Sequence, residues 1–106
     1  RVNMSLSIST TDHGSGKAVV VTGEVDVSNA DQLRDAVDAA LPEAQVELVV
    51  DLAEVPYIDS TGIGVLVGAA HRAQEAGKKL VVARPQSNVA RVLGLLGVSG
   101  DLNIQQ

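Results

Sequence analysis

The sequence predicts an α/β domain with a mixed β-sheet that is mostly parallel, has an antiparallel first strand and is covered by helices. Short runs rich in Val, Leu and Ile alternate with amphipathic segments along the 106 residues. Alternating strands and helices indicate βαβ crossovers, which build parallel sheets. Two strand-like runs joined by a glycine-containing turn open the chain, so the first strand is expected to pair antiparallel. The expected order is ββαβαβαβ, in one domain over residues 1–106.

The first two strands differ in polarity. Residues 5–10 alternate Leu6 and Ile8 with polar residues, which is typical of a strand with one polar face at a sheet edge. Residues 12–16 contain two glycines and are expected to turn. Residues 17–25 are rich in valine and form the second expected strand.

The first helix is indicated by apolar residues at helical spacing and by signals at both ends. Ser28 is the expected N-cap, and Asp31 follows three residues later in a position like that of a capping box. Pro42 is expected to end the helix. The apolar face consists of Ala30, Leu33, Val37 and Ala40 or Leu41.

Two buried strands flank the second helix. Residues 46–52 are almost continuously apolar and β-branched, as in a central parallel strand. The helix is expected from about residue 60 to residue 76, with Gly77 just beyond its end. Its inward face is Ile63, Leu66, Val67, Ala70 and Ala73. Residues 79–83 form the next strand.

The last elements are short. Ser87 is the expected N-cap of a third helix, which Gly97 ends. Residues 102–104 are expected to form a final strand. Arg1 is not a natural start, so residues 1–4 are expected to be tag residues, disordered, or the cut edge of a longer chain.

Composition excludes several classes of protein. The chain has no Phe, no Trp and one Tyr, so the core must be built from aliphatic residues. A net charge of -5 argues against nucleic acid or an anionic membrane as the main partner. No apolar run approaches the roughly 18 residues of a membrane span, and there is no signal-peptide pattern. We therefore expect a cytoplasmic protein.

Metal and thiol chemistry are not expected. The chain has no Cys, which excludes disulfides, thiol catalysis and cysteine-ligated zinc. His13 and His71 lie far apart in the sequence, without ligand-like spacing to each other. Both are expected to be solvated side chains, and no metal is expected.

The most informative segment is residues 58–66, where a strand-like run becomes a helix-like run. Ser60 stands at this point, with Asp59 before it and two glycines after it. A helix N-terminus has unpaired N–H groups and a partial positive charge, so a serine there can cap the helix or carry a phosphate. On these residues alone, a cap made by Ser60 or Asp59 and a phosphorylation switch both remain open.

Enzyme motifs come close in this segment but fail. The spacing Gly62-x-Gly64-x-x-x-Gly68 places the third glycine one residue too late for a dinucleotide loop, and Arg84 stands where an acidic residue is needed. A serine nucleophile would need a histidine base, but His71 would lie about 16 Å away along the same helix. We expect neither an enzyme nor a cofactor.

Four motifs in order resemble those of the STAS domain family. They are TGEVD at residues 22–26, VVDL at 49–52, YIDSTGIGVL at 57–66, and VARVL at 89–93 followed by LGV. Within the family, the chain is most similar to the bacterial anti-sigma factor antagonists, also called anti-anti-sigma factors. The resemblance covers about residues 5–105.

The resemblance implies a function in transcription regulation by partner switching. In this subfamily the unphosphorylated protein binds an anti-sigma factor that is also a serine/threonine kinase, and sigma factor is released. The kinase phosphorylates the serine after the motif aspartate, here Ser60, and binding is switched off. A PP2C-type phosphatase restores the unphosphorylated form. A single-domain chain without a membrane segment fits the cytosolic, free-standing branch, and the acidic surface favours a monomer when the protein is free.

The resemblance also implies which residues meet the partner. The expected partner-binding residues are Glu24, Asp26, Asp59, Ser60, Thr61, Gly62 and Gly64. Thr61 is a second, weaker candidate phosphate acceptor. The two glycines allow either close approach of a partner or packing of the helix on the sheet, and the sequence favours neither role.

Two other functions stay open. The chain could be a STAS module excised from a larger protein, such as a stressosome-like scaffold or the cytosolic domain of an anion transporter. It could also bind nucleotides weakly, although no phosphate-binding loop with a lysine supports this. Family members often carry a further C-terminal helix, and its absence would leave one sheet face less covered.

Overall fold

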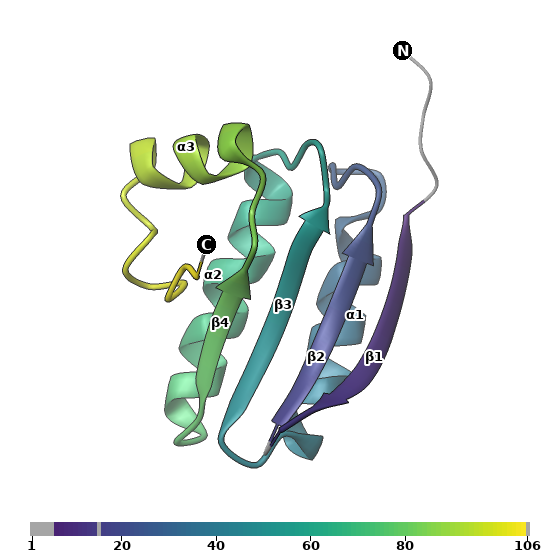
Figure 1. The fold of residues 1–106 in the computed structure, drawn as a ribbon, viewed down its shortest axis with the longest axis vertical. Helices are drawn as coiled ribbons and strands as arrows, with labels where there is room; N and C mark the ends of the chain where they lie inside the picture. Colours follow the sequence, from purple (N-terminus) through teal and green to yellow (C-terminus); the bar gives the residue numbers. More distant parts are fainter. Residues whose placement is uncertain (1–5, 15, 106) are drawn as a thin grey trace.

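The computed structural model describes residues 6–14 and 16–105 (Figure 1). The expectations for residues 1–4 and for Ser15 in the first turn lie outside the described residues. The elements are β1 (Ser7–His13), β2 (Gly16–Thr22), α1 (Ala30–Ala40), the 3₁₀ helix η1 (Leu41–Glu43), β3 (Glu47–Glu54), α2 (Ser60–Glu75), β4 (Lys79–Ala83) and α3 (Ser87–Leu95).

The four strands form one mixed sheet in the order β1-β2-β3-β4. β1 pairs antiparallel with β2, whereas β2 with β3 and β3 with β4 are parallel. β1 lies at an edge, as its alternating pattern predicts. The predicted fold class, a mostly parallel sheet with an antiparallel first strand, is confirmed.

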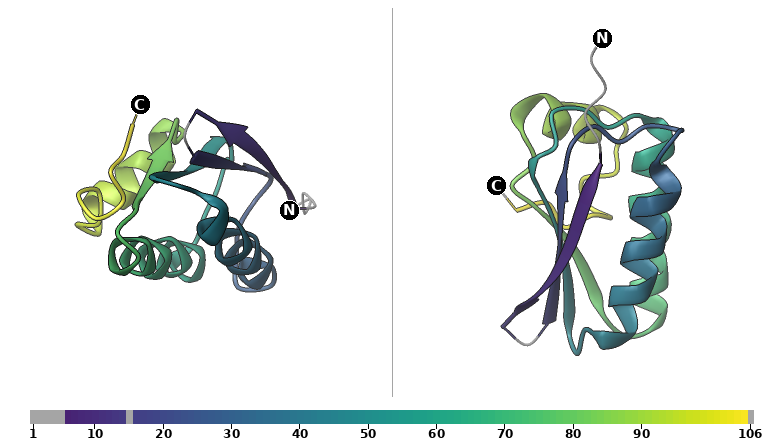
Figure 2. Two further views of the ribbon diagram at one scale, coloured as in Figure 1. Left: turned by 90° about the horizontal axis from the view of Figure 1, so that it is seen from below. Right: turned by 90° about the vertical axis from the view of Figure 1, so that its right-hand side faces the viewer.

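Helices α1 and α2 lie side by side on one face of the sheet and bury the core against it (Figure 2). Leu33 and Val37 of α1 and Leu66 of α2 are fully buried there. They pack against the inward-facing residues of the strands, which include Val19, Val21, Leu48, Val50, Leu52, Leu80 and Val82. Because the buried side chains are Val, Leu, Ile and Ala, the core has the aliphatic composition that the sequence predicts.

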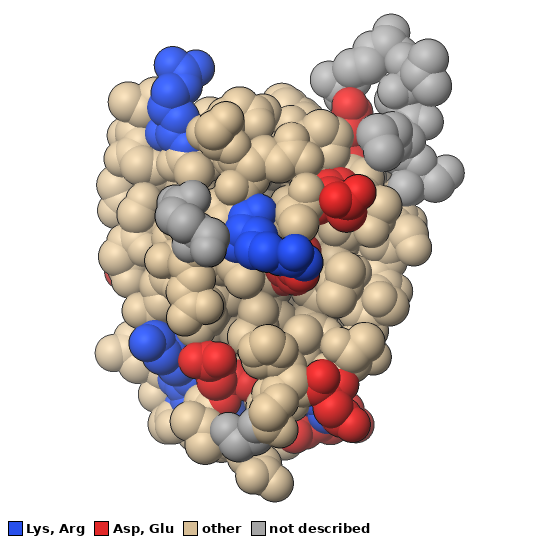
Figure 3. Space-filling model, in the orientation of Figure 1, with Lys and Arg blue, Asp and Glu red and all other residues tan. Residues whose placement is uncertain are grey.

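Among residues 6–14 and 16–105, no helix covers most of the other face of the sheet (Figures 1 and 2). It holds a second, smaller apolar cluster of Ala18, Val49 and Val81. Figure 3 views this face, where uncharged side chains dominate and blue and red side chains meet near the middle. Val81 pairs with Val49, and Val49 with Ala18, so these three form one row across the strands.

Two predicted helix caps are wrong by one residue. Helix α1 begins at Ala30 with Asn29 as its N-cap residue, and the Asn29 side chain makes no capping hydrogen bond to the described part of the helix. The Ser28 hydroxyl instead donates to Asp26 Oδ1, because the chain turns tightly between Asp26 and the helix. In α3, Ser87 is the first helical residue rather than the cap.

Strand ends also differ from the prediction. β2 stops at Thr22, since Gly23 has a φ of 113°, and Val25 makes only an isolated parallel bridge to Ile58. β1 continues through His13 instead of turning at residue 12. The predicted strand at 102–104 is replaced by a turn and a single parallel bridge between Ala83 and Gln105. Asn103, with a φ of 49°, interrupts the extended conformation there.

The helix ends agree better. α2 runs from Ser60 to Glu75, close to the predicted 60–76, and Gly77 follows with a φ of 74°. Gly97, which the sequence predicts as the stop of α3, has a φ of 72°. Such positive φ angles favour glycine. Within the described residues, no helix has the length and apolar character needed to cross a membrane.

Candidate functional site

The site forms where the segments after β2 and β3 meet the start of α2. The backbone N–H of Val25 donates to Tyr57 O at 3.0 Å, and that of Asp59 donates to Val25 O at 3.0 Å. These two bonds bring the acidic segment at Glu24 and Asp26 beside the segment that leads into α2. The structure therefore brings together motifs that lie more than 30 residues apart in the sequence.

Asp59 is the N-cap of α2 and also holds the neighbouring loop. Its Oδ1 accepts from Gly62 N at 3.0 Å, and its Oδ2 accepts from Val27 N at 3.1 Å. The first bond satisfies an N–H of the first helical turn. Of the two caps that the sequence leaves open, the structure uses Asp59.

Ser60 is the first residue of α2 and is exposed. Thr61, the next residue, is exposed too. Within the described part of the chain, no hydrogen bond involves the Ser60 hydroxyl. Because Asp59 makes the cap, the Ser60 hydroxyl is not used as the N-cap of α2 and faces solvent.

The loop between β2 and α1 is braced by its own polar groups. Asp26 Oδ1 accepts from Ser28 N at 2.9 Å, and Asp26 N donates to Asn29 Oδ1 at 2.9 Å. The Asn29 amide donates to Glu24 O at 2.9 Å. These bonds hold Glu24 and Asp26 at the edge of the site, where both are partly exposed. Val27, at the tip of the loop, is 76% exposed.

The two glycines of the site have different surroundings. A Cβ added at Gly62 would lie 2.7 Å from Ile58 Cγ1 and 2.7 Å from Val25 Cγ1, so Gly62 is required for packing of the helix start. A Cβ at Gly64 would meet no atom of the described residues within 4 Å, and Gly64 is exposed. Packing therefore explains Gly62 but not Gly64, which offers bare backbone to the outside.

Two amides support the segment before α2 from the side of α3. Asn88 Nδ2 donates to Pro56 O at 2.8 Å, and Gln86 Nε2 donates to Ala53 O at 3.0 Å. Sequence reasoning missed both residues. Their only signal is two amide side chains at the start of a helix, which by itself does not identify a contact more than 30 residues away.

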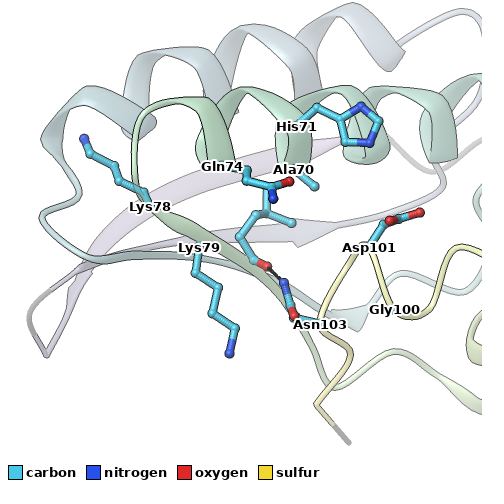
Figure 4. A pocket seen from close by; sticks show the side chains of 9 residues that line it. Ala70, His71, Gln74, Lys78, Lys79, Gly100, Asp101 and Asn103 are labelled. Atoms are coloured by element: carbon cyan, nitrogen blue, oxygen red, sulfur yellow. Dashed lines mark hydrogen bonds between the residues drawn. The ribbon is translucent and has the colours of Figure 1, made fainter.

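Neither histidine joins the site. His71 lies in the second half of α2 and lines a groove of about 370 Å³ with Gln74 and with Asp101 and Asn103 of the C-terminal turn (Figure 4). The Asn103 amide donates to Leu80 O at 2.8 Å beside that groove. Among the described residues, no group of three or more His, Asp or Glu side chains is placed to hold a metal ion.

The sequence matches a known protein family and a relative of known name. The family model described as "Mlab, STAS domain" matches residues 8–105. The anti-sigma-B factor antagonist of Listeria monocytogenes is 31% identical over 98% of this chain and 90% of that protein.

Solved structures are also similar. The crystal structure of an anti-sigma factor antagonist from Mycobacterium paratuberculosis has a TM-score of 0.83 at 25% identity, over 95% of this chain and 86% of that one. The anti-sigma factor antagonist SpoIIAA in its unphosphorylated form has a TM-score of 0.75 at 17% identity, over 94% and 88%. The structure of SpoIIAA in its phosphorylated form has a TM-score of 0.69 at 17% identity, over 94% of this chain and 91% of that one.

Proposed function

The chain belongs to the STAS domain family, and we propose that it is an anti-sigma factor antagonist controlled by phosphorylation of Ser60. In its unphosphorylated form it binds an anti-sigma factor that is a serine kinase, which releases sigma factor. Phosphorylation switches this binding off, and a PP2C-type phosphatase restores it. The partner-binding surface comprises Glu24, Asp26, Asp59, Ser60, Thr61, Gly62 and Gly64.

The observation that carries the proposal is the exposed Ser60 hydroxyl beside an independent helix cap. Asp59 satisfies the Gly62 N–H, so a kinase can modify Ser60 without breaking a bond that holds α2. The helix N-terminus also favours a negative group, typically by about 0.3–1 kcal/mol. Phosphorylation is therefore expected to leave the fold intact and to act on the interface.

The acidic surroundings explain how a phosphate would weaken binding. A phosphoserine adds about -1.5 to -2 charges and three acceptor oxygens. Asp59 directly precedes Ser60. Asp26 directly follows Val25, whose backbone O accepts a hydrogen bond from the Asp59 N–H. A partner surface fitted to a neutral hydroxyl would have to accommodate this bulk and desolvate a dianion. Each loss of about 1.4 kcal/mol weakens binding tenfold, so a loss of a few kcal/mol is enough for a switch.

Related proteins support the proposal. SpoIIAA shares the fold and has been solved in unphosphorylated and phosphorylated forms, so this fold accommodates both states in that protein. The Listeria relative, at 31% identity, is named an anti-sigma-B factor antagonist. Together they favour a regulator with the same kind of partner.

The test begins with capture of the partner. Wild type and Ser60→Ala are used as baits in lysate of the native host, and the retained proteins are identified by mass spectrometry. We expect both baits to retain an anti-sigma factor with a kinase domain. The purified kinase and ATP are then added to wild type, Ser60→Ala and the neighbouring control Thr61→Ala, and phosphate is mapped.

The outcomes are distinct. Phosphate on wild type and Thr61→Ala but not on Ser60→Ala supports the site, provided that the phosphorylated protein no longer binds the kinase. Phosphate at another residue, with Ser60 unmodified, refutes the site. Undiminished binding of protein that is fully phosphorylated at Ser60 refutes the switch.

A further inference from the structure

The sheet face that carries no helix contains a hollow of about 400 Å³. Its apolar floor is formed by small side chains, namely Ala18, Val20, Val49 and Ala83. They come from the adjacent strands β2, β3 and β4. Ala18 and Val20 of β2 pair with Val49 and Asp51 of β3, and Asp51 pairs with Ala83 of β4. The volume lies within the range of about 300–1,000 Å³ that is typical of small-molecule sites.

Arg84 at the rim has an unusual backbone. Its φ of 54° is in the left-handed region, which few residues other than glycine adopt, and Pro85 follows it. The Arg84 N–H donates to Gln105 O at 2.7 Å, which holds this conformation at the end of β4. Its NH2 group donates to Asp51 Oδ2, so the guanidinium is fixed beside the floor of the hollow.

Asp51 orients the guanidinium, and each of its two oxygens already accepts one hydrogen bond. Oδ2 accepts from Arg84, and Oδ1 accepts from Ala53 N at 3.0 Å. The Asp51 side chain is 15% exposed, whereas that of Arg84 is 64% exposed. Within the described part of the chain, the remaining guanidinium N–H groups make no hydrogen bond. An arginine can therefore hold Asp51 with one nitrogen and a second planar anion with its other N–H groups.

The other polar groups of the rim can all donate hydrogen bonds. They are the Thr11 hydroxyl, the His13 ring and the Gln105 amide. Donors thus surround a hollow whose carboxylate already has a partner at each oxygen. A ligand head that accepts hydrogen bonds fits this arrangement, whereas an ammonium would lie beside the Arg84 cation and be repelled by it. The apolar floor suits an alkyl chain.

We propose that this hollow is a binding site for a small alkyl carboxylate, with the carboxylate on Arg84 and the alkyl chain on Ala18, Val20, Val49 and Ala83. The site lies on the sheet face opposite α1 and α2 and uses none of the residues around Ser60. It is therefore a second site, independent of the proposed kinase-binding surface.

The test is a titration of the ¹⁵N-labelled protein with sodium octanoate, followed by amide chemical shifts. We expect saturable shifts at Val20, Asp51 and Ala83, with a Kd on the order of 1 mM. Octylamine has the same chain and the opposite charge, and it is expected to bind at least about tenfold more weakly. Butyrate, with a shorter chain, is expected to bind more weakly than octanoate.

Three variants separate the parts of the site. Arg84→Gln removes the anion partner and is expected to weaken octanoate binding at least about tenfold. Because that change also leaves Asp51 without its cation, Ala83→Leu provides an independent test. The larger side chain fills the floor of the hollow and keeps the charges of Arg84 and Asp51. We expect it to abolish the octanoate-induced shifts and to leave the circular dichroism spectrum unchanged. Arg91→Gln, at an exposed residue of α3 that does not line the hollow, is the control and is expected to bind like wild type.

Several results would overturn the proposal. One is the absence of saturable shifts up to about 20 mM octanoate, which is roughly twenty times the expected Kd. A second is equal binding of octylamine, and a third is octanoate binding by folded Arg84→Gln or Ala83→Leu with the affinity of wild type. Shifts confined to α1 and α2 would also contradict it, because they would place the ligand on the other face.

Discussion

Asp59 accepts a hydrogen bond from the backbone N–H of Val27, at 3.1 Å and across 32 positions of sequence. The other oxygen of the same carboxylate accepts from Gly62 N at 3.0 Å. One side chain thus fixes the start of α2 and the tip of the β2–α1 loop relative to each other. Since Ser60 and Val27 both lie next to these bonds, Asp59 fixes these two residues relative to each other, while Asn29 braces the segment of Glu24 and Asp26.

The first prediction concerns the stability that Asp59 provides. Asp59→Ala removes a helix cap and the bond to Val27, so we expect the free energy of unfolding to fall by about 1–2 kcal/mol. Urea denaturation measures this. Asp31→Ala, which removes an exposed acid paired with Arg34 at 3.1 Å, is the control and is expected to cost less than about 0.5 kcal/mol. Equal effects of the two changes would contradict the role of Asp59.

The second prediction separates the two glycines of the site. Gly62→Ala places a methyl group 2.7 Å from Ile58 and Val25 side-chain atoms, and we expect it to lower the free energy of unfolding by about 1–3 kcal/mol. Gly64→Ala has open space and replaces a helical glycine, so we expect a gain of about 0.5–1 kcal/mol. Thermal or urea unfolding of the pair gives the signs, and changes of the same sign would show that the packing argument is wrong.

The third prediction is a pH dependence that comes from Asp51. Burial raises the pKa of this carboxyl, but hydrogen bonds from Arg84 and Ala53 N–H and the charge of Arg84 outweigh burial and lower the pKa below its usual value. A carboxyl with a lowered pKa in the folded state stabilises the protein above its unfolded pKa of about 3.9. That contribution is lost as the pH falls through the lower, folded pKa.

We therefore expect the stability difference between wild type and Asp51→Asn to be largest near neutral pH and to shrink below about pH 4. Urea unfolding at a series of pH values gives this difference. NMR titration of the Asp51 carboxyl in Arg84→Gln should show a higher pKa than in wild type. An Asp51 pKa that is unchanged by loss of Arg84 would contradict the assigned cause.

The fourth prediction rests on the proposed function and concerns Val27, which is 76% exposed beside Asp59. If the partner covers this site, Val27→Ser should weaken kinase binding by about tenfold, or 1.4 kcal/mol, without changing stability. Val46→Ser is the matched control. Val46 is 58% exposed, but it precedes the start of β3, whereas the candidate site lies beyond the end of β3. Isothermal titration calorimetry compares the two. A larger loss for Val46→Ser would place the interface elsewhere.

Local sequence patterns were sufficient to predict most of the fold. The strand predicted over residues 79–83 is observed as Lys79–Ala83, and α2 lies within one residue of its predicted end. These elements have continuous apolar or helical patterns and a glycine at the boundary. The predicted strand at 102–104 failed because a short apolar pattern does not reveal a left-handed residue such as Asn103.

The site required tertiary information for its details. Asp59 and Ser60 are both good capping residues, so the sequence does not choose between them. In the structure the Asp59 carboxylate accepts hydrogen bonds from Gly62 N and Val27 N and is therefore the cap. The packing role of Gly62 depends on the side chain of Val25, which is distant in sequence. The pair of Asp51 and Arg84 spans 33 positions, and no local periodicity predicts it.

The aliphatic core has a consequence for spectroscopy. Tyr57 is the only Phe, Tyr or Trp in the chain, and it is 40% exposed, two residues before Asp59. The tyrosine absorbance and emission of the free protein therefore arise entirely beside the candidate interface and report nothing directly from the core. Quenching of this emission can follow docking of a partner without any label, whereas unfolding is better followed by circular dichroism of the backbone.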